Sequence, residues 1–358
     1  MDRYKLVISD FHIGTGQLME DGEVNPLEAF IFDGRFISFL EYYMSDDFKR
    51  AEVELILNGD FLNTLQVQYG EETPTEVTEA EAVGKARAIF AGHAELFEAL
   101  KKFAAAPHHR LTYIVGNHDP AILWPAVRQE FNNRLEAEVH YPGFSYSFDG
   151  IWVEHGQQYT AANRFDPGRL FIKDQRGDVI LNLPWGSVWV IEYLNAIKKE
   201  KPWIDRVQPF SRYLLLGLFF NPVFALPALI RLVAFFIRHQ LSGGRWKQWG
   251  EVKRTWGLLT ELSIIPALEK EARKILARPG YHTVILGHNH QPAFRRFGKE
   301  KLYVNTGTWN DIIHLDIPNL GRTRRMTYVF IDYPEKRRPR TRLKIWKGTH
   351  QTEENVIF

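Results

Sequence analysis

Residues 111–119 read LTYIVGNHD, an apolar run followed directly by a glycine and three polar residues. The run 111–115 is short and rich in β-branched and aromatic side chains, which predicts a buried strand. The side-chain oxygen of Asn117 is a competent metal ligand, and His118 can donate a proton if Asp119 orients its ring. Taken alone, the same residues also fit an ordinary turn in which Asn117 hydrogen bonds to nearby backbone.

Four further apolar runs, at residues 5–9, 53–57, 151–154 and 283–286, are predicted strands, and each also ends at residues that can bind a metal ion. Any one of these endings could be a turn or a surface loop. Open α/β sheets bind ligands beyond the carboxyl ends of their strands, so five such ends in order predict one shared site. The other four endings are Asp10-Phe11-His12, Asn58-Gly59-Asp60, Glu154-His155-Gly156 and Gly287-His288-Asn289-His290.

The composition limits the partners of this site. Hydrophobic residues make up 45% of the chain and charged residues 25%, as expected of a protein that buries a core. There is no cysteine, so disulfides and thiolate sites are excluded and any metal must be held by oxygen and imidazole. The net charge of +2 does not demand a nucleic-acid partner. The N-terminus carries no secretory signal, so we predict a cytoplasmic protein.

Strands and helices alternate through the first part of the chain, with helices predicted at 26–44 and 76–105. Strands predicted at 302–305, 327–332 and 342–346 have less helix between them. This pattern predicts an α/β fold of two packed sheets flanked by helices. Residues 157–280 are rich in Trp, Pro and Arg and contain no obvious strand. We therefore predict a catalytic domain formed by residues 1–156 and 281–358, with residues 157–280 as a helical insertion.

The five motifs together resemble the calcineurin-like metallophosphoesterase family, whose pattern runs Asp-x-His, Gly-Asp, Gly-Asn-His, His and Gly-His-x-His. The resemblance implies a four-layer αββα sandwich of two mixed sheets. It also implies two divalent metal ions, with manganese favoured over iron or zinc. The first ion would be held by Asp10, His12, Asp60 and His290, and the second by Asp60, Asn117, His155 and His288. Asp60 would bridge the two.

Such a metal pair suits hydrolysis of a phosphoester or pyrophosphate. Two divalent ions about 4 Å apart can bind phosphoryl oxygens and acidify a bridging water to the attacking hydroxide. His118 would then protonate the leaving oxygen, with Asp119 fixing its ring. Many family members continue the second motif as Gly-Asp-x-x-Asp, whereas this chain has Asn63 at the last position. We expect Asn63 to hydrogen bond a metal-ligating His, more weakly than a carboxylate would.

The insertion contains a strongly apolar segment at residues 213–237, which is long enough to cross a bilayer. Asn221, Pro222 and Pro227 interrupt it, so we predict two helices that form an apolar cap or a hairpin dipping into an anionic membrane. Peripheral membrane association would follow. A single spanning helix and a buried helical pair without any lipid role are the alternatives.

A hydrophobic cap at this place in the chain resembles the UDP-2,3-diacylglucosamine pyrophosphatases, which implies a lipid-linked substrate. Those enzymes usually carry Gly-Asn-Arg-Asp where this chain has His118. Asn163 and Arg164 follow the His155 motif and are predicted to bind a phosphate or sugar, although a loop arginine is equally often merely exposed. A nuclease and a non-catalytic scaffold of the same fold are the rival functions; the first would need a basic aromatic groove, and the second would lack ligands.

Overall fold

The computed structural model describes residues 1–19, 21–70, 74–241, 268–315, 320–334, 338–348 and 354–355. The part of the predicted insertion at residues 242–267 lies outside the described residues.

A seven-stranded mixed sheet forms the centre of the fold, in the order β17-β16-β15-β1-β2-β3-β4. Neighbouring strands β1 to β4 are parallel, and β15 runs antiparallel to β1. Their carboxyl ends therefore meet at one edge of the sheet. The strands are β1 (Arg3–Ile8), β2 (Glu52–Asn58), β3 (His109–Ile114), β4 (His140–Gly143), β15 (Thr327–Asp332), β16 (Arg340–Ile345) and β17 (Glu354–Asn355).

A second mixed sheet of five strands packs on the first, in the order β11-β12-β10-β6-β5. Strand β10 is parallel to both β6 and β12, so the carboxyl ends of these strands also share one edge. The strands are β5 (Ser145–Phe148), β6 (Ile151–Glu154), β10 (Thr283–Leu286), β11 (Ala293–Phe297) and β12 (Lys301–Asn305).

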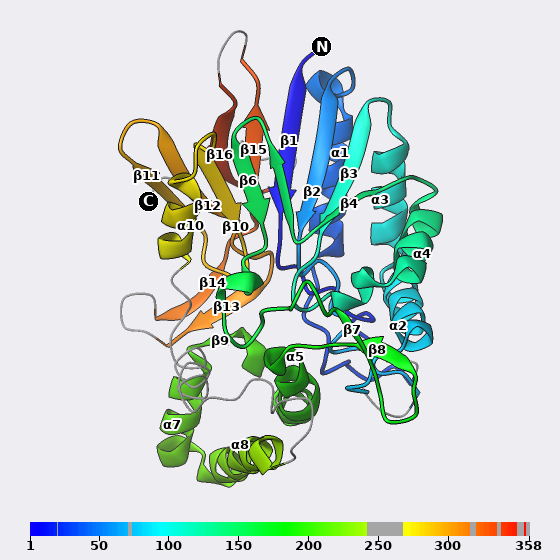
Figure 1. The fold of residues 1–358 in the computed structure, drawn as a ribbon, viewed down its shortest axis with the longest axis vertical. Helices are drawn as coiled ribbons and strands as arrows, with labels where there is room; N and C mark the ends of the chain where they lie inside the picture. Colours follow the sequence, from blue (N-terminus) through cyan, green and yellow to red (C-terminus); the bar gives the residue numbers. More distant parts are fainter. Residues whose placement is uncertain are drawn as a thin grey trace.

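The alternation of side chains along the strands produces four layers. In β1, Val7 faces the second sheet and packs in a cluster with Val153 and Ile285, whereas Leu6 and Ile8 face the helices on the other side. One outer layer contains α1 (Asp33–Met44), α2 (Glu79–Gly92), α3 (Ala94–Ala105) and α4 (Pro125–Leu135), and α10 (Glu269–Leu276) covers the second sheet. The predicted four-layer αββα sandwich is thus confirmed (Figure 1).

Two helix predictions were wrong in extent. The helix predicted to start at residue 26 begins at Asp33, because the Glu28 carboxylate binds the backbone N–H groups of Gly14, Gly16 and Phe30 and holds an irregular loop. The helix predicted over 76–105 begins at a capping box formed by Thr78 and Glu81, and it is divided at His93.

The insertion is mixed rather than purely helical, which corrects the prediction that it contains no strand. Short strands β7 (Phe171–Lys173) and β8 (Val179–Leu181) pair with each other, and β9 (Val207–Gln208) joins β13 (Asp311–His314) and β14 (Gly321–Arg324) in a small sheet. Two or three residues are too few to show an alternating pattern.

Apart from α10, which packs on the second sheet, the helices of the predicted insertion lie below the carboxyl ends of the main strands (Figure 1). They are α5 (Trp185–Trp189), a π-helical segment η4 (Val190–Leu194), α6 (Asn195–Glu200), α7 (Phe210–Phe220) and α8 (Pro222–Leu241). Helices α7 and α8 are separated at Asn221, as the sequence predicted. Pro227 does not end α8, because it lies near the start of the helix and removes only one backbone hydrogen bond there.

Candidate metal centre

The loops that follow β1, β2 and β10 carry five predicted ligands in the left-handed backbone conformation. The φ angles are 58° for Asp10, 54° for His12, 53° for Asp60, 71° for His288 and 61° for His290. Non-glycine residues adopt this conformation rarely and at a cost of about 1–3 kcal/mol each. Such strain persists where the surroundings over-determine it, and it clusters at functional sites.

The glycines of the motifs let the ligand loops approach each other closely. A Cβ at Gly116 would lie 2.2 Å from Asp60 Oδ1, and a Cβ at Gly59, which has a φ of 76°, would lie 2.6 Å from the His155 ring. Any side chain at either position would push these ligands apart.

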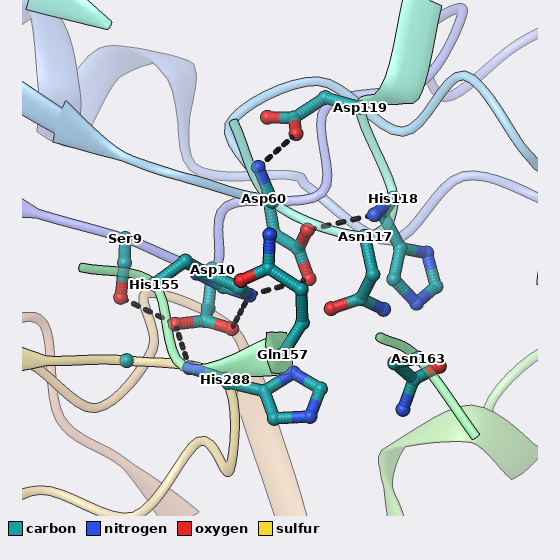
Figure 2. A network of polar contacts seen from close by, with 12 residues as sticks. Ser9, Asp10, Asp60, Asn117, His118, Asp119, His155, Gln157, Asn163 and His288 are labelled. Atoms are coloured by element: carbon teal, nitrogen blue, oxygen red, sulfur yellow. Dashed lines mark hydrogen bonds and ion pairs between the residues drawn. The ribbon is translucent and has the colours of Figure 1, made fainter. Parts of the chain in front are cut away.

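In each of the two central carboxylates, Asp10 and Asp60, one oxygen accepts hydrogen bonds from neighbouring groups of the protein. Asp10 Oδ2 accepts hydrogen bonds from the Ser9 hydroxyl and from the His288 backbone N–H, the latter at 3.1 Å. Asp60 Oδ1 accepts a hydrogen bond of 2.7 Å from the backbone N–H of His118 (Figure 2). The backbone therefore orients both groups and leaves the other oxygen of each for a different partner.

The free oxygens face imidazole nitrogens. Asp10 Oδ1 lies 3.2 Å from His290 Nε2, and Asp60 Oδ2 lies 3.1 Å from His155 Nε2. His12 Nε2 and His290 Nε2 are 3.0 Å apart. Metal bonds of about 2.0–2.2 Å place two ligand atoms on one ion about 3 Å from each other, so these separations fit cations between the side chains.

Buried polar atoms without hydrogen bonds point to the same conclusion. Among the described residues, Asp10 Oδ1 and Asn117 Oδ1 are buried and accept no hydrogen bond, which is costly unless another partner is bound. His155 Nδ1 donates a hydrogen bond of 2.8 Å to Asn58 O, so its Nε2 is the nitrogen left for a metal ion. The ligand atoms form three groups, Asp10 with His12 and His290, His12 with Asp60 and His118, and Asp60 with His155 and His288.

The electrostatics of the cluster favour positive charge. Burial alone would raise the pKa of Asp60, but the neighbouring His155 and His118 rings hold it well below its usual range. Burial alone would lower the pKa of His155, but Asp60 and Asp10 raise it to about 10. The two buried carboxylates therefore stabilise positive charge in the site, and divalent metal ions can supply that charge.

His118 is oriented differently from the prediction. Its Nδ1 donates a hydrogen bond of 3.1 Å to Asn63 Oδ1, not to Asp119. The Asp119 carboxylate instead accepts from the backbone N–H groups of Phe61 and Gly116 and from the Tyr113 hydroxyl. Asp119 therefore shapes the Gly-Asn-His loop, and its burial near Asp60 raises its pKa to about 7. Asn63 was expected to hydrogen bond a metal-ligating histidine, but it hydrogen bonds to His118 instead.

A chain of amides ties this histidine to the insertion. Asn195 Nδ2 donates to the backbone oxygen of Leu65, and Asn195 Oδ1 accepts from Gln66 Nε2, both at 3.0 Å. Gln66 Oε1 in turn accepts from Asn63 Nδ2 at 2.6 Å. The Leu65 backbone oxygen can only accept, so it fixes the orientation of the Asn195 amide and, through it, those of Gln66 and Asn63. Asn63 Oδ1 therefore faces His118 and accepts a hydrogen bond from its protonated Nδ1. The free nitrogen of His118 is therefore Nε2.

A cavity of about 270 Å³ extends from the ligand cluster into the insertion. Asn163, a predicted substrate contact, lines this cavity. Arg164 does not line it and is exposed. Sequence reasoning missed Gln66, Asn195 and Arg206, which all neighbour the site in the folded chain, and no local motif marks them. Ser9 could have been found, since it directly precedes Asp10.

The chain matches the calcineurin-like phosphoesterase family over residues 5–292. Among solved structures, Vacuolar Protein Sorting 29 from Cryptosporidium parvum is 11% identical, with a TM-score of 0.36, covering 100% of this chain and 98% of its own. A dimetal phosphatase from Danio rerio is 9% identical, with a TM-score of 0.37, and the match covers 99% of this chain and 98% of the phosphatase. No curated protein matches in sequence. The match over most of its length shows that the chain belongs to the calcineurin-like phosphoesterase family.

Proposed function

We propose that the protein is a dinuclear metal-dependent phosphoesterase that uses Asp10, His12, Asp60, Asn117, His155, His288 and His290 as ligands, with manganese as the favoured metal. The observation that carries this proposal is the set of three adjoining ligand groups, in which the first and second share His12 and the second and third share Asp60. Bound ions would supply Lewis acidity toward the phosphoryl oxygens and would lower the pKa of water.

The side chains around the cluster would assist the transfer in distinct ways. The oxygen of water forms a bond to phosphorus as the bond from phosphorus to the leaving oxygen breaks. With Nδ1 of His118 committed to Asn63, Nε2 is the atom that can carry a proton to that leaving oxygen. Burial lowers the pKa of His118, and an anionic phosphoryl group beside the ring favours its protonated form.

The cavity supports a substrate with both a phosphate and an apolar group. Its wall in the catalytic half carries the ligand cluster, and its wall in the insertion is largely apolar, with Trp185, Trp189 and Phe210 among the lining residues. A phosphoester or diphosphate with a lipid chain, of the UDP-diacylglucosamine kind, has matching chemistry. A nucleic acid would be served by a basic groove, whereas Arg206 is the one lysine or arginine among the described lining residues.

We also propose that the hairpin formed by α7 and α8 contacts a membrane surface. Its tip is strongly exposed, at 83% for Phe219, 85% for Phe220 and 86% for Val223. Residues 210–241 contain three arginines and no acidic residue. Arg231 pairs with Glu200 and Arg238 with Glu192, so Arg212 is the arginine of this segment that has no carboxylate partner among the described residues and suits an anionic headgroup.

An interfacial position is favoured over a spanning one. Helix α8 is long and apolar enough to cross a bilayer by length and composition. However, Ala225, Ala228 and Phe235 are buried against the protein, and the Tyr193 hydroxyl donates to the backbone oxygen of Ala228 at 3.0 Å. One face of α8 is thus covered by other parts of the insertion, and its exposed residues Leu226, Ile230 and Ile237 could enter a headgroup layer.

Hydrolysis with added manganese tests the catalytic proposal. Wild-type protein is expected to hydrolyse p-nitrophenyl phosphate or bis-p-nitrophenyl phosphate. Asp60→Asn is expected to lose at least about 1,000-fold in kcat and much of the rise in Tm that manganese causes, because ligand binding stabilises the folded state. Asp21→Asn, at an exposed turn, is the control.

The proposal fails if Asp60→Asn and His118→Ala both retain wild-type rates. Faster cleavage of single-stranded DNA than of any lipid diphosphate would favour the nuclease alternative.

A further inference from the structure

The cavity beside the ligand cluster has a polar part and an apolar part, and Arg206 lines it while it hydrogen bonds to Ala29 of the catalytic domain. The polar part belongs to the catalytic domain and includes His12, Asp60, Asn117 and His118. The apolar part belongs to the insertion and is lined by Trp185, Trp189, Val190, Leu194, Ile204 and Phe210. Arg206 is the one lysine or arginine that lines either part within the described residues of the chain.

The backbone around Arg206 is held in place from both sides. It ends a short 3₁₀ helix (Ile204–Arg206) and immediately precedes β9, whose Val207 pairs with Ile313 of β13. Its Nη2 donates a hydrogen bond of 3.0 Å to the backbone oxygen of Ala29, which also lines the cavity. The guanidinium is thus fixed between the insertion and the loop that follows the first ligand motif.

Nothing in the described structure neutralises this guanidinium. The two cavity-lining carboxylates near it are already paired, Asp205 with Lys198 at 2.5 Å and Asp311 with Arg322 and Arg324. No carboxylate of the described residues forms an ion pair with Arg206, and its Nε is buried without a hydrogen-bond acceptor. Arg206 is half-buried, and its buried Nε–H without an acceptor is costly. An anion that accepts its hydrogen bonds would offset that cost.

We propose that Arg206 binds a second anionic group of the substrate, next to the phosphoryl group that reacts at the ligand cluster. This inference rests on the proposed phosphoesterase function and narrows its substrate class to diphosphates that carry an apolar chain. The reacting phosphate lies in the polar part, the second phosphate meets Arg206, and the chain enters the apolar part. A guanidinium is well suited to the role because it binds phosphate through two parallel hydrogen bonds.

Binding of two non-hydrolysable ligands tests this assignment. Dodecyl methylenediphosphonate and dodecyl phosphonate share the apolar chain and differ by one anionic group. In isothermal titration calorimetry with manganese present, Arg206→Gln is expected to weaken binding of the diphosphonate by about tenfold or more, the range of a lost charge-assisted hydrogen bond, and binding of the monophosphonate less than about twofold. Arg206→Lys should fall between wild type and Arg206→Gln.

The control variant is Arg176→Gln, in the exposed turn between β7 and β8, which should bind both ligands as wild type does. Equal weakening of both ligands, or no weakening of either, overturns the assignment. Its failure can be separated from failure of the proposed function. If wild type lacks activity on p-nitrophenyl phosphate while the selective loss in Arg206→Gln holds, the anion site stands and the hydrolytic proposal falls.

Discussion

The His118 ring is held by a neutral amide rather than by a carboxylate, and this difference affects the stability of its protonated form. A carboxylate partner would stabilise the imidazolium, whereas Asn63 orients the ring without adding negative charge. The direction of the Asn63 amide is in turn set by Gln66 and Asn195. The position of the histidine therefore depends on side chains from both the catalytic domain and the insertion.

Removal of the Asn63 amide should affect turnover more than binding. Asn63→Ala is expected to lower kcat on p-nitrophenyl phosphate by about 10–100-fold, the usual effect of losing a partner that orients a catalytic histidine, with KM within about twofold. Asn63→Asp keeps an acceptor for Nδ1 and should restore most of kcat. Asn133→Ala, on α4 away from the site, is the control. A wild-type kcat in Asn63→Ala would show that the hydrogen bond has no role.

The ligand motifs were readable at the residue scale because each directly follows an apolar strand. Asp10, Asp60 and His155 need no knowledge of distant residues to be noticed. The partner of His118 could not be identified from the sequence, because Asn63 is 55 positions away from it. Asp119, the nearest carboxylate in sequence, is instead bonded to backbone N–H groups and Tyr113.

At the scale of elements, the break between α2 and α3 supports the first ligand loop. His93 lies at the break, and its ring contacts Asp33 at the start of α1 and Glu28 in the preceding loop. Glu28 also binds the backbone N–H groups of Gly14 and Gly16, just after His12. A Cβ at Gly92 would lie 2.1 Å from the backbone oxygen of Thr15, so the loop packs directly on the helix end. A continuous helix would displace this loop.

This buried ion-pair cluster should make stability depend on pH. Burial alone would lower the pKa of His93, but hydrogen bonds with Asp33 and Glu28 raise it to about 9. Since this value lies above that of an unfolded histidine, about 6.5, the stabilisation is complete below pH 6.5 and disappears as the pH rises through 9. The shift corresponds to at most about 3 kcal/mol.

Urea unfolding of wild type and His93→Gln with EDTA, between pH 6 and pH 9.5, measures this effect. The difference in free energy of unfolding between the two proteins is expected to be largest at pH 6 and to shrink toward pH 9.5. His140→Gln, at an exposed position in β4, should show no such trend. A difference that stays constant over the range would contradict the assigned ion pairs.

At the scale of the whole molecule, residues 185–210 line part of the cavity, and residues 210–241 present an apolar hairpin to the outside. Lys198 donates to the backbone oxygen of Leu27, and Arg206 donates to that of Ala29, so the insertion is joined to the catalytic domain beside the ligand cluster.

The exposed apolar residues at the tip of the α7–α8 hairpin are expected to determine how strongly the protein binds to lipid vesicles. Wild-type protein is expected to sediment with phosphatidylglycerol vesicles more than with phosphatidylcholine vesicles. Replacing Phe219, Phe220 and Val223 together with Ser should reduce binding by at least about tenfold, because the apolar area available for insertion is lost. Hydrolysis of p-nitrophenyl phosphate should be unchanged.

The matched control is Leu18→Ser with Val24→Ser, which changes two exposed apolar residues outside the hairpin. Equal binding by the control and the hairpin variant would argue against the membrane contact, as would wild-type protein that stays in the supernatant.

The sequence by itself determined the fold class and the candidate ligand motifs, because both depend on local patterns. Apolar runs of four to six residues form buried strands, and the polar residues that follow them must lie at the strand ends. Only the tertiary structure decided which side chains meet across long separations: Asn63 with His118, His93 with Glu28, and Arg206 with the cavity. These contacts depend on how layers and insertion pack together, and no local periodicity encodes that packing.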